Sequence, residues 1–275
     1  MLRSDNDHMP ASELIVTRPV DGTMVVTIDR AAKRNALDAN LVECLHEALD
    51  AAAIANAHLL CLRGAGASFC TGFDLSDLDS ETDGDLLLRF VRIEMLLNRI
   101  YNAPFVTLAL AHGDVRGAGA DLFAACERRF VVDDARFCFP GAALGAVAGL
   151  GRLVSRVGRD HGREIMRSGR ELGADEALAI GLASGLVTRA EVDSLLTRES
   201  AAASRLDRET IAALHAVRAS DGAEDLAHLT MSAARPGLKD RILAYRERMT
   251  QRKQQLALVQ QRFVQSPSVG GGDGH

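Results

Sequence analysis

Two glycine-rich segments contain the residues whose types and spacing could do chemistry. The first is Ser68–Leu75 (SFCTGFDL), and the second runs from Gly113 to Asp121 (GDVRGAGAD). Each is expected to connect a strand to a helix, where backbone N–H groups stay free and the helix dipole favours negative charge. Two such donors aimed at one point would stabilise a developing oxyanion by several kcal/mol. Taken singly, each segment is also compatible with an ordinary turn.

Neither segment matches the other well-known glycine-rich sites. The spacings Gly64-x-Gly66 and Gly117-x-Gly119 lack the third glycine of a dinucleotide fingerprint, and no clear acidic residue closes a second strand about 20 residues further on. Walker A, H-E-x-x-H and G-x-S-x-G patterns are absent from the sequence. Dinucleotide-dependent oxidoreduction is therefore disfavoured.

The elements around these segments alternate between strands and helices, as in an α/β layered fold. Asp21-Gly22 favours a hairpin between the first two strands, Asp38 is a candidate N-cap, and Pro104 ends the second helix. The predicted strands are residues 13–18, 23–29, 58–63, 105–111, 129–132 and 136–139, and the predicted helices are residues 38–56, 84–102 and 117–126.

After Gly149 the pattern indicates helices only, the last of which has Pro236 in its first turn. The expected fold class is thus α/β with a helical C-terminal extension. Its parts are a flexible leader (1–12), the core (13–190), a C-terminal helical oligomerisation region (191–265) and a disordered tail (266–275). The helices predicted after Gly149 are residues 150–157, 161–168, 174–181, 191–206, 207–219, 222–233 and 236–264.

The composition excludes several classes of function. The net charge of −5 argues against a nucleic-acid partner, which would need a basic face. Five cysteines without a C-x-x-C pair argue against a disulfide scaffold or a zinc site. No apolar run is long enough to span a membrane, and the polar N-terminus does not look like a signal peptide, so a cytoplasmic location is expected.

Several ordered segments together make the chain resemble the crotonase, or enoyl-CoA hydratase/isomerase, superfamily. The resemblance extends from about Leu14 to Val187, with the segments in the family's order and spacing. The matching segments are Lys33-Arg34-Asn35-Ala36-Leu37, Phe69–Leu75, Ala111–Leu122, Phe137–Gly145, Gly149–Gly158 and Gly173–Val187.

The resemblance implies a crotonase-like spiral of ββα units whose C-terminal helices build trimers, often paired into hexamers. It implies acyl-CoA thioester substrates and no metal or redox cofactor, with coenzyme A entering only as part of the substrate. The backbone N–H groups of Phe73 and Ala118 would form the oxyanion hole, and Asp121 would be the acid or base. The residues implied to bind the substrate are Lys33, Arg34, Asn35, Ala36 and Leu37, with the last four along the adenine, and Cys70, Gly72, Asp74, Gly117 and Gly141.

The sequence departs from the family where hydratases carry two glutamates. One of these positions is Asp121, which keeps a carboxylate on a shorter side chain, and the other is Gly141, which has none. Adding water needs one group to take its proton and another to complete the addition, so hydration should be impaired. Isomerisation or decarboxylation is at least as plausible, and the alternative is a catalytically silent acyl-CoA-binding or assembly subunit.

Four other features near these segments have open roles. His112 is expected to make a structural hydrogen bond, and Arg116 could pair with Asp121 or with a substrate carboxylate. The Phe73 ring could narrow the acyl pocket or stack on an aromatic acyl group. The basic stretch 239–253 could reach a neighbouring subunit's coenzyme A, although a solvated helix face is the simpler interpretation.

Overall fold

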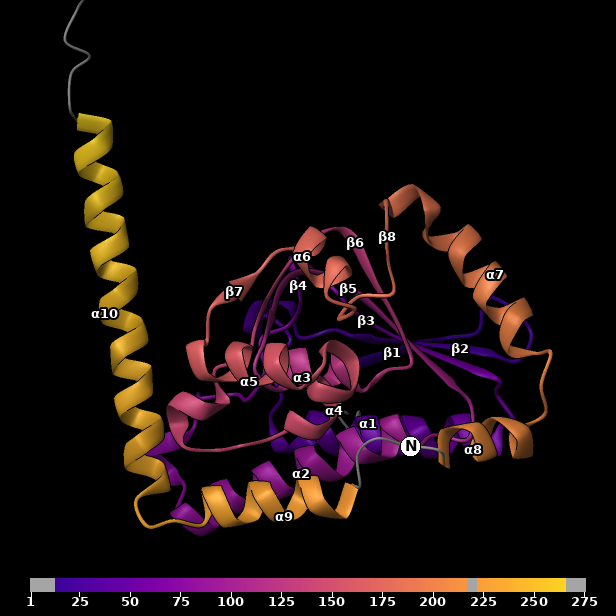
Figure 1. Ribbon diagram of the computed structural model, residues 1–275, viewed down its shortest axis with the longest axis horizontal. Coiled ribbons are helices and arrows are strands. Elements are labelled where there is room, and N and C mark those ends of the chain that lie inside the picture. The colour runs from indigo at the N-terminus through magenta and orange to yellow at the C-terminus, as the bar shows by residue number, and fades with distance from the viewer. Residues whose placement is uncertain (1–12, 217–221, 266–275) are drawn as a thin grey trace, which may run out of the picture.

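The computed structural model describes residues 13–216 and 222–265, arranged as a mixed sheet with helices on both faces (Figure 1). The predicted leader, the predicted tail and the end of the helix predicted at 207–219 lie outside the described residues. The sheet order is β1-β2-β3-β5-β6-β7, with β4 beside β5 and β8 beside β6. The strands are β1 (Leu14–Thr17), β2 (Thr23–Ile28), β3 (Leu59–Gly64), β4 (Ser68–Cys70), β5 (Val106–Arg116), β6 (Arg128–Cys138), β7 (Glu171–Leu172) and β8 (Gly185–Val187).

The first hairpin and the first helix form as their local signals predict. β1 and β2 are antiparallel around a turn in which Gly22 has a φ of +65°. α1 (Ala39–Ile54) begins after Asp38, whose carboxylate accepts a hydrogen bond from Leu41 N. The pairs β2–β3, β3–β5 and β5–β6 are all parallel, because helical crossovers return the chain to the same end of the sheet.

The central strands are apolar throughout because both faces of the sheet are covered. Met24 and Val26 pack under the helices α1, α2 (Asp83–Tyr101) and α3 (Ala118–Ala125) in the main core. Val25 points to the other face, where it packs with Leu195 of α7 (Val192–Ala203). The crotonase-type α/β fold expected from the sequence is confirmed.

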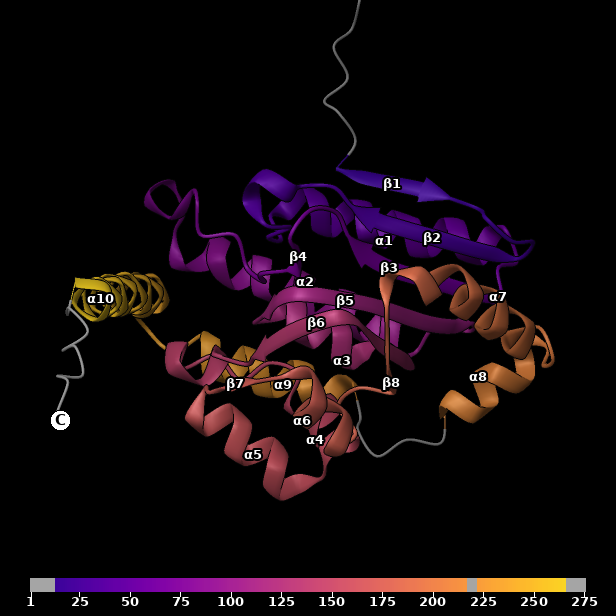
Figure 2. The same cartoon turned by 90° about the horizontal axis from the view of Figure 1, so that it is seen from above.

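The C-terminal part of the chain is mainly helical, as predicted. α9 (Gly222–Ala233) packs along α2 beneath the main body, and α10 (Leu238–Gln265) begins against α2 and then projects away from the main body (Figures 1 and 2). Pro236 precedes α10 by two residues instead of lying in its first turn. The remaining helices are α4 (Leu150–Val157), α5 (Arg159–Ser168), α6 (Ala174–Ala179) and α8 (Arg208–Ala216).

The strand predictions around the second glycine-rich segment need correction. β5 does not stop at Ala111 but continues through a bulge at Gly113 to Arg116, because residues 113–116 pair with β6. The two strands predicted at 129–132 and 136–139 are one strand, β6, which bends where Asp133 has a φ of +59°. The expectation of helices only after Gly149 is wrong, because β7 and β8 pair with β6.

Within residues 13–216 and 222–265, no helix combines the length and the apolar composition that crossing a bilayer requires.

Candidate active site

The Phe73 N–H is left free by the way its segment pairs with the segment after β2. Leu37 N donates to Gly72 O at 2.7 Å, and Asp74 N donates to Leu37 O at 2.9 Å. This parallel bridge uses the groups on either side of Phe73, so the Phe73 N–H points away from Leu37. No hydrogen bond from it to any described residue is present.

The Ala118 N–H is free because Ala118 is the first residue of α3. Gly117, with φ 51° and ψ −127°, turns the chain from β5 into this helix while its own N–H donates to Cys138 O at 2.9 Å. Within the described part of the chain, Ala118 N has no acceptor. A β-carbon on Gly72 would lie 3.0 Å from Ala118 N and 2.6 Å from Arg116 O, so the two glycine-rich segments touch.

Asp121 follows Ala118 by three residues and therefore lies on the same face of α3. It is 8 % exposed, and its Oδ1 has no hydrogen-bond partner among the described residues. Burial raises the pKa of Asp121 to about 8; Arg152 opposes this rise, and Glu94 and Asp225 add to it. A carboxyl group in this state can give or take a proton near neutral pH.

Gly141 lies beside the same turn, with a backbone carbonyl group close to where a side chain would stand. A β-carbon on Gly117 would be 3.9 Å from Pro140 Cγ, which places the Pro140-Gly141 pair next to the start of α3. At Gly141 itself, a β-carbon would be 2.9 Å from Ala146 O, since Ala146 N closes the loop onto Gly141 O at 3.1 Å. A side chain at position 141 would therefore require Ala146 O to move.

The Lys33–Leu37 segment wraps around the first glycine-rich segment. Asn35 is fully buried, and its amide donates to Ala65 O at 2.9 Å and Ser68 O at 2.8 Å, so its side chain holds loops together. Ala36 and Leu37 are buried as well, whereas Lys33 and Arg34 are exposed. Ligand contacts from this segment can therefore come from its backbone and from the two exposed cations.

Asp74 and Cys70 support the Phe73 turn from within the protein. Although burial opposes ionisation, hydrogen bonds from Ser76 and Arg30 hold the pKa of Asp74 below its usual value. Burial raises the pKa of the Cys70 thiol to about 12, so it is not a nucleophile at neutral pH. Its sulfur accepts a hydrogen bond from Gly72 N at 3.4 Å.

The Phe73 ring already contacts two side chains of α2. It stacks on Phe90, with 4.6 Å between the ring centroids, and the guanidinium of Arg89 lies 3.9 Å from its centroid. The ring thus bounds the site on the side of α2. A further aromatic group from a substrate would have to compete with these contacts.

Arg116 and His112, which precede α3, bond to residues outside the site. Arg116 pairs with Asp114 at 3.2 Å and with Glu171 at 2.5 Å, so the predicted pairing with Asp121 is wrong. His112 makes the expected structural hydrogen bond, with its Nε2 2.9 Å from Gly66 O.

A buried ion cluster behind Asp121 is the main feature that sequence reasoning missed. Arg152 of α4 is 1 % exposed and donates to Glu94 at 2.6 Å, Asp225 at 3.3 Å and Asn98 at 2.9 Å. Glu94 and Asn98 lie on α2, Arg152 on α4 and Asp225 on α9, so the cluster joins three helices that are far apart in the sequence. The available signal was that Glu94 falls on the apolar face of its helix.

The comparisons agree with this fold. The family model for enoyl-CoA hydratase/isomerase matches residues 20–235. A Mycobacterium leprae protein named as a probable enoyl-CoA hydratase is 32 % identical over 183 residues, which are 63 % of this chain and 71 % of that protein. The fold and the match over most of the chain define a crotonase-class protein. The chain belongs to the enoyl-CoA hydratase/isomerase family.

Two solved structures extend the likeness to the whole fold. One is a protein from Bordetella parapertussis that is named as an enoyl-CoA hydratase/isomerase. It is 44 % identical with a TM-score of 0.82, and the match covers 85 % of this chain and 98 % of that chain. An enoyl-CoA hydratase/isomerase from Xanthobacter autotrophicus Py2 is 24 % identical with a TM-score of 0.77, covering 94 % and 99 %. The second likeness shows the fold alone.

Proposed function

We propose that this protein is an acyl-CoA thioester enzyme that stabilises an enolate with the N–H groups of Phe73 and Ala118. The observation that carries the proposal is that both N–H groups lack a partner in the described structure while Gly72 brings their segments into contact. As negative charge develops on the thioester oxygen, two fixed donors stabilise it more than they stabilise the neutral carbonyl. No metal or redox cofactor is required for this step.

Asp121 would move the proton at the carbon next to the thioester. It lies one helical turn beyond Ala118, and its pKa of about 8 suits transfer in either direction at neutral pH. In an isomerisation it would take a proton from one carbon of the substrate and return it to another. In a decarboxylation it would protonate the α-carbon after carbon dioxide has left.

Hydration is the less favoured reaction of this family for this chain. The shortened acid Asp121 stands at one hydratase position, and Gly141, where a side chain would require Ala146 O to move, stands at the other. A water molecule would therefore have one carboxyl group instead of two to position and activate it. The relatives named as hydratases support the thioester substrate class more strongly than the exact reaction.

The coenzyme A part would lie along the Lys33–Leu37 backbone, with the exposed Lys33 and Arg34 close to its phosphates. The projecting helix α10 would pack against other copies of the chain in a homotrimer or homohexamer. Both statements follow from family membership and from the exposure of these residues.

A second candidate function is a catalytically silent acyl-CoA-binding or assembly subunit. The observation that favours it is the absence of a carboxylate at Gly141, where Ala146 O crowds the place of a side chain. Such a protein would keep the two N–H donors and bind thioesters without turning them over.

Affinity and turnover measured on the same preparation separate these functions. Calorimetry would give the affinity for crotonyl-CoA, a 3-enoyl-CoA, malonyl-CoA and an aryl-CoA, and each would be assayed for turnover with the wild type and Asp121→Asn. Turnover that Asp121→Asn abolishes without loss of affinity supports the enzyme. Tight binding with no turnover of any thioester supports the silent subunit, and no binding contradicts both.

A further inference from the structure

The site contains a second carboxyl group, which comes from α2 instead of the loop at position 141. Glu94 is fully buried, and its Oε1 accepts from Arg152 Nη2 at 2.6 Å. Its Oε2 has no hydrogen-bond partner within the described chain, and the same is true of Asp121 Oδ1. A β-carbon on Gly149, at the start of the helix that carries Arg152, would lie 2.6 Å from Asp121 Oδ1. The two acids therefore flank one helix start.

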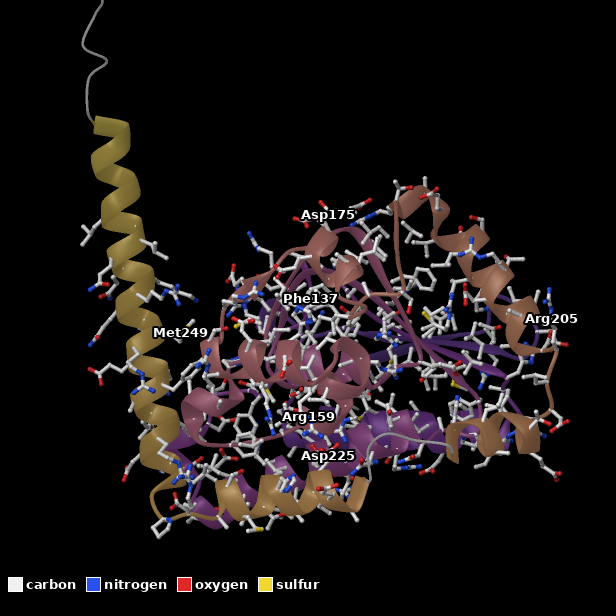
Figure 3. All side chains as sticks on the ribbon, in the orientation of Figure 1. Phe137, Arg159, Asp175, Arg205, Asp225 and Met249 are labelled. Atoms are coloured by element: carbon white, nitrogen blue, oxygen red, sulfur yellow. The ribbon has the colours of Figure 1, made fainter. Side chains whose placement is uncertain are left out.

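The Arg152 guanidinium bonds to Glu94 and to a third acid, and it acts on Asp121 through its charge alone. Arg152 also donates to Asp225 at 3.3 Å, which lies on the face of α9 turned toward α4 and α2 (Figure 3). Asp225 in turn accepts from Gly151 N at 3.1 Å. The charged groups acting on Asp121 are thus Arg152 from α4, Glu94 from α2 and Asp225 from α9, and from β4 the neutral Cys70 thiol packs on the same helix at Gly119.

Electrostatics decides where a proton resides in such a cluster. Two buried carboxylates facing one shared guanidinium cannot both ionise without a large cost, so one of them holds a proton. Burial raises the pKa of Glu94, but Arg152 opposes this rise through its charge and its short hydrogen bond, so Glu94 is the acid that keeps its charge. Asp121 has no direct bond to Arg152, and its bare oxygen is the place for the proton.

We propose that Glu94, held in its charged form by Arg152, is a positioning residue that opposes ionisation of Asp121, so that Asp121 enters the catalytic cycle as a proton donor. The negative charge that Arg152 holds on Glu94 opposes ionisation of Asp121. This rests on the proposed function, and it assigns Glu94 the role of second carboxyl group in a site that has none at position 141.

The assignment selects among the reactions considered above. Decarboxylation of an α-carboxyl thioester is the one whose first proton transfer is a donation. The bond between the α-carbon and the carboxylate breaks, its electron pair passes into the thioester enolate, and carbon dioxide leaves. Asp121 then gives its proton to the α-carbon, and solvent returns a proton to Asp121. An isomerisation would instead begin with Asp121 ionised.

Infrared difference spectroscopy tests the proton's location without any substrate. The wild type should show the carbonyl stretch of a protonated buried carboxylic acid that titrates near pH 8, and Asp121→Asn should abolish it. Glu94→Gln should move that titration at least about one pH unit lower, because an opposing charge has been removed. Glu94→Asp, which keeps the charge, should stay close to the wild type and guards against a folding defect.

The matched control is Glu199→Gln, which removes another buried carboxylate paired with an arginine, Arg128 at 2.8 Å, away from α3. It should leave the titration unchanged. A carboxylic-acid band that persists in Asp121→Asn, or a titration in Glu94→Gln equal to that in Glu199→Gln, overturns the proposal. If a substrate is turned over, kcat/KM should fall as pH rises through the same titration, and a rise would contradict the donor role. An intact titration without turnover would count against the proposed function alone.

Discussion

Two buried arginines, Arg129 and Arg152, hold this fold together in different ways. Arg129 is 7 % exposed, and its guanidinium donates only to backbone carbonyl groups, at distances of 2.6 to 3.3 Å. Burial lowers its pKa to about 9, and neutral carbonyl groups cannot restore it. Its acceptors are Leu182 O, Cys126 O, Glu127 O and Gly181 O.

Arg152 instead bonds to titratable side chains, and three polar atoms of its cluster have no hydrogen bond to a described residue. Its own Nε, Glu94 Oε2 and Asp121 Oδ1 have no partner in the described residues. Unpaired buried polar atoms cost free energy, and native proteins retain them mainly where they serve a function. The difference teaches that Arg129 joins the chain's turns, whereas Arg152 holds ionised acids beside a site.

Asp121→Asn removes the acid that distinguishes the surroundings of Arg152 from those of Arg129. We expect kcat/KM to fall by about 10²–10⁴-fold, because a positioned acid or base contributes that much. The free energy of unfolding should change little at low pH, where both side chains are neutral in the folded and unfolded protein, and it should be higher in Asp121→Asn near pH 7. Steady-state kinetics and urea denaturation would measure both, with Asp175→Asn, an exposed acid on α6, as control (Figure 3). Full activity in Asp121→Asn would contradict the assignment.

The same exchange at both arginines should separate their roles by pH. Arg152→Met leaves the Glu94 carboxylate without its cation, and we expect a loss of about 3–5 kcal/mol near pH 7. That loss should shrink at lower pH as Glu94 takes up a proton. Arg129→Met leaves carbonyl groups unpaired, so its loss of about 2–3 kcal/mol should not depend on pH. Urea denaturation from pH 5 to pH 8 measures both, and parallel pH profiles would refute the distinction.

The raised pKa of Asp121 should also appear in the stability of the wild type. The folded protein holds this proton up to a pH of about 8, whereas the ordinary pKa of an aspartate, which applies to the unfolded state, is 3.8. Between these values the folded state binds more protons, so the stability that it contributes below pH 3.8 is lost as pH rises toward 8. Relative to Asp121→Asn, the wild type should lose on the order of a few kcal/mol across this window. A constant difference would show that Asp121 is ionised.

Local signals in the sequence predicted much of the fold. The Asp38 cap, the Asp21-Gly22 hairpin and the apolar strands were foreseen because neighbouring residues determine them. The continuation of β5 to Arg116 and the short strand β8 were not, because only pairing with β6 makes those residues strands.

The candidate site divides in the same way. The glycine-rich turns indicated free N–H groups, the family resemblance placed them at Phe73 and Ala118, and the structure leaves both without a partner among the described residues. The role of Glu94 could not be foreseen, because its contact with Arg152 joins residues 58 positions apart. A charge on an apolar helix face was the local trace of that contact.

The smallest expected effect tests whether the site also depends on backbone shape. Gly72 and Gly169 both have positive φ, +83° and +58°, but only Gly72 has close neighbours, with a β-carbon placed 2.6 Å from Arg116 O. Gly169→Ala should therefore cost about 1 kcal/mol of stability from backbone strain and leave kcat/KM unchanged. Gly72→Ala should cost about 2 kcal/mol and lower kcat/KM more than tenfold, because it pushes the Ala118 donor away from Phe73. Equal effects on kcat/KM would mean that the distance between the two donors does not limit kcat/KM. The charge state of the acids around Arg152 would then be the main determinant of activity.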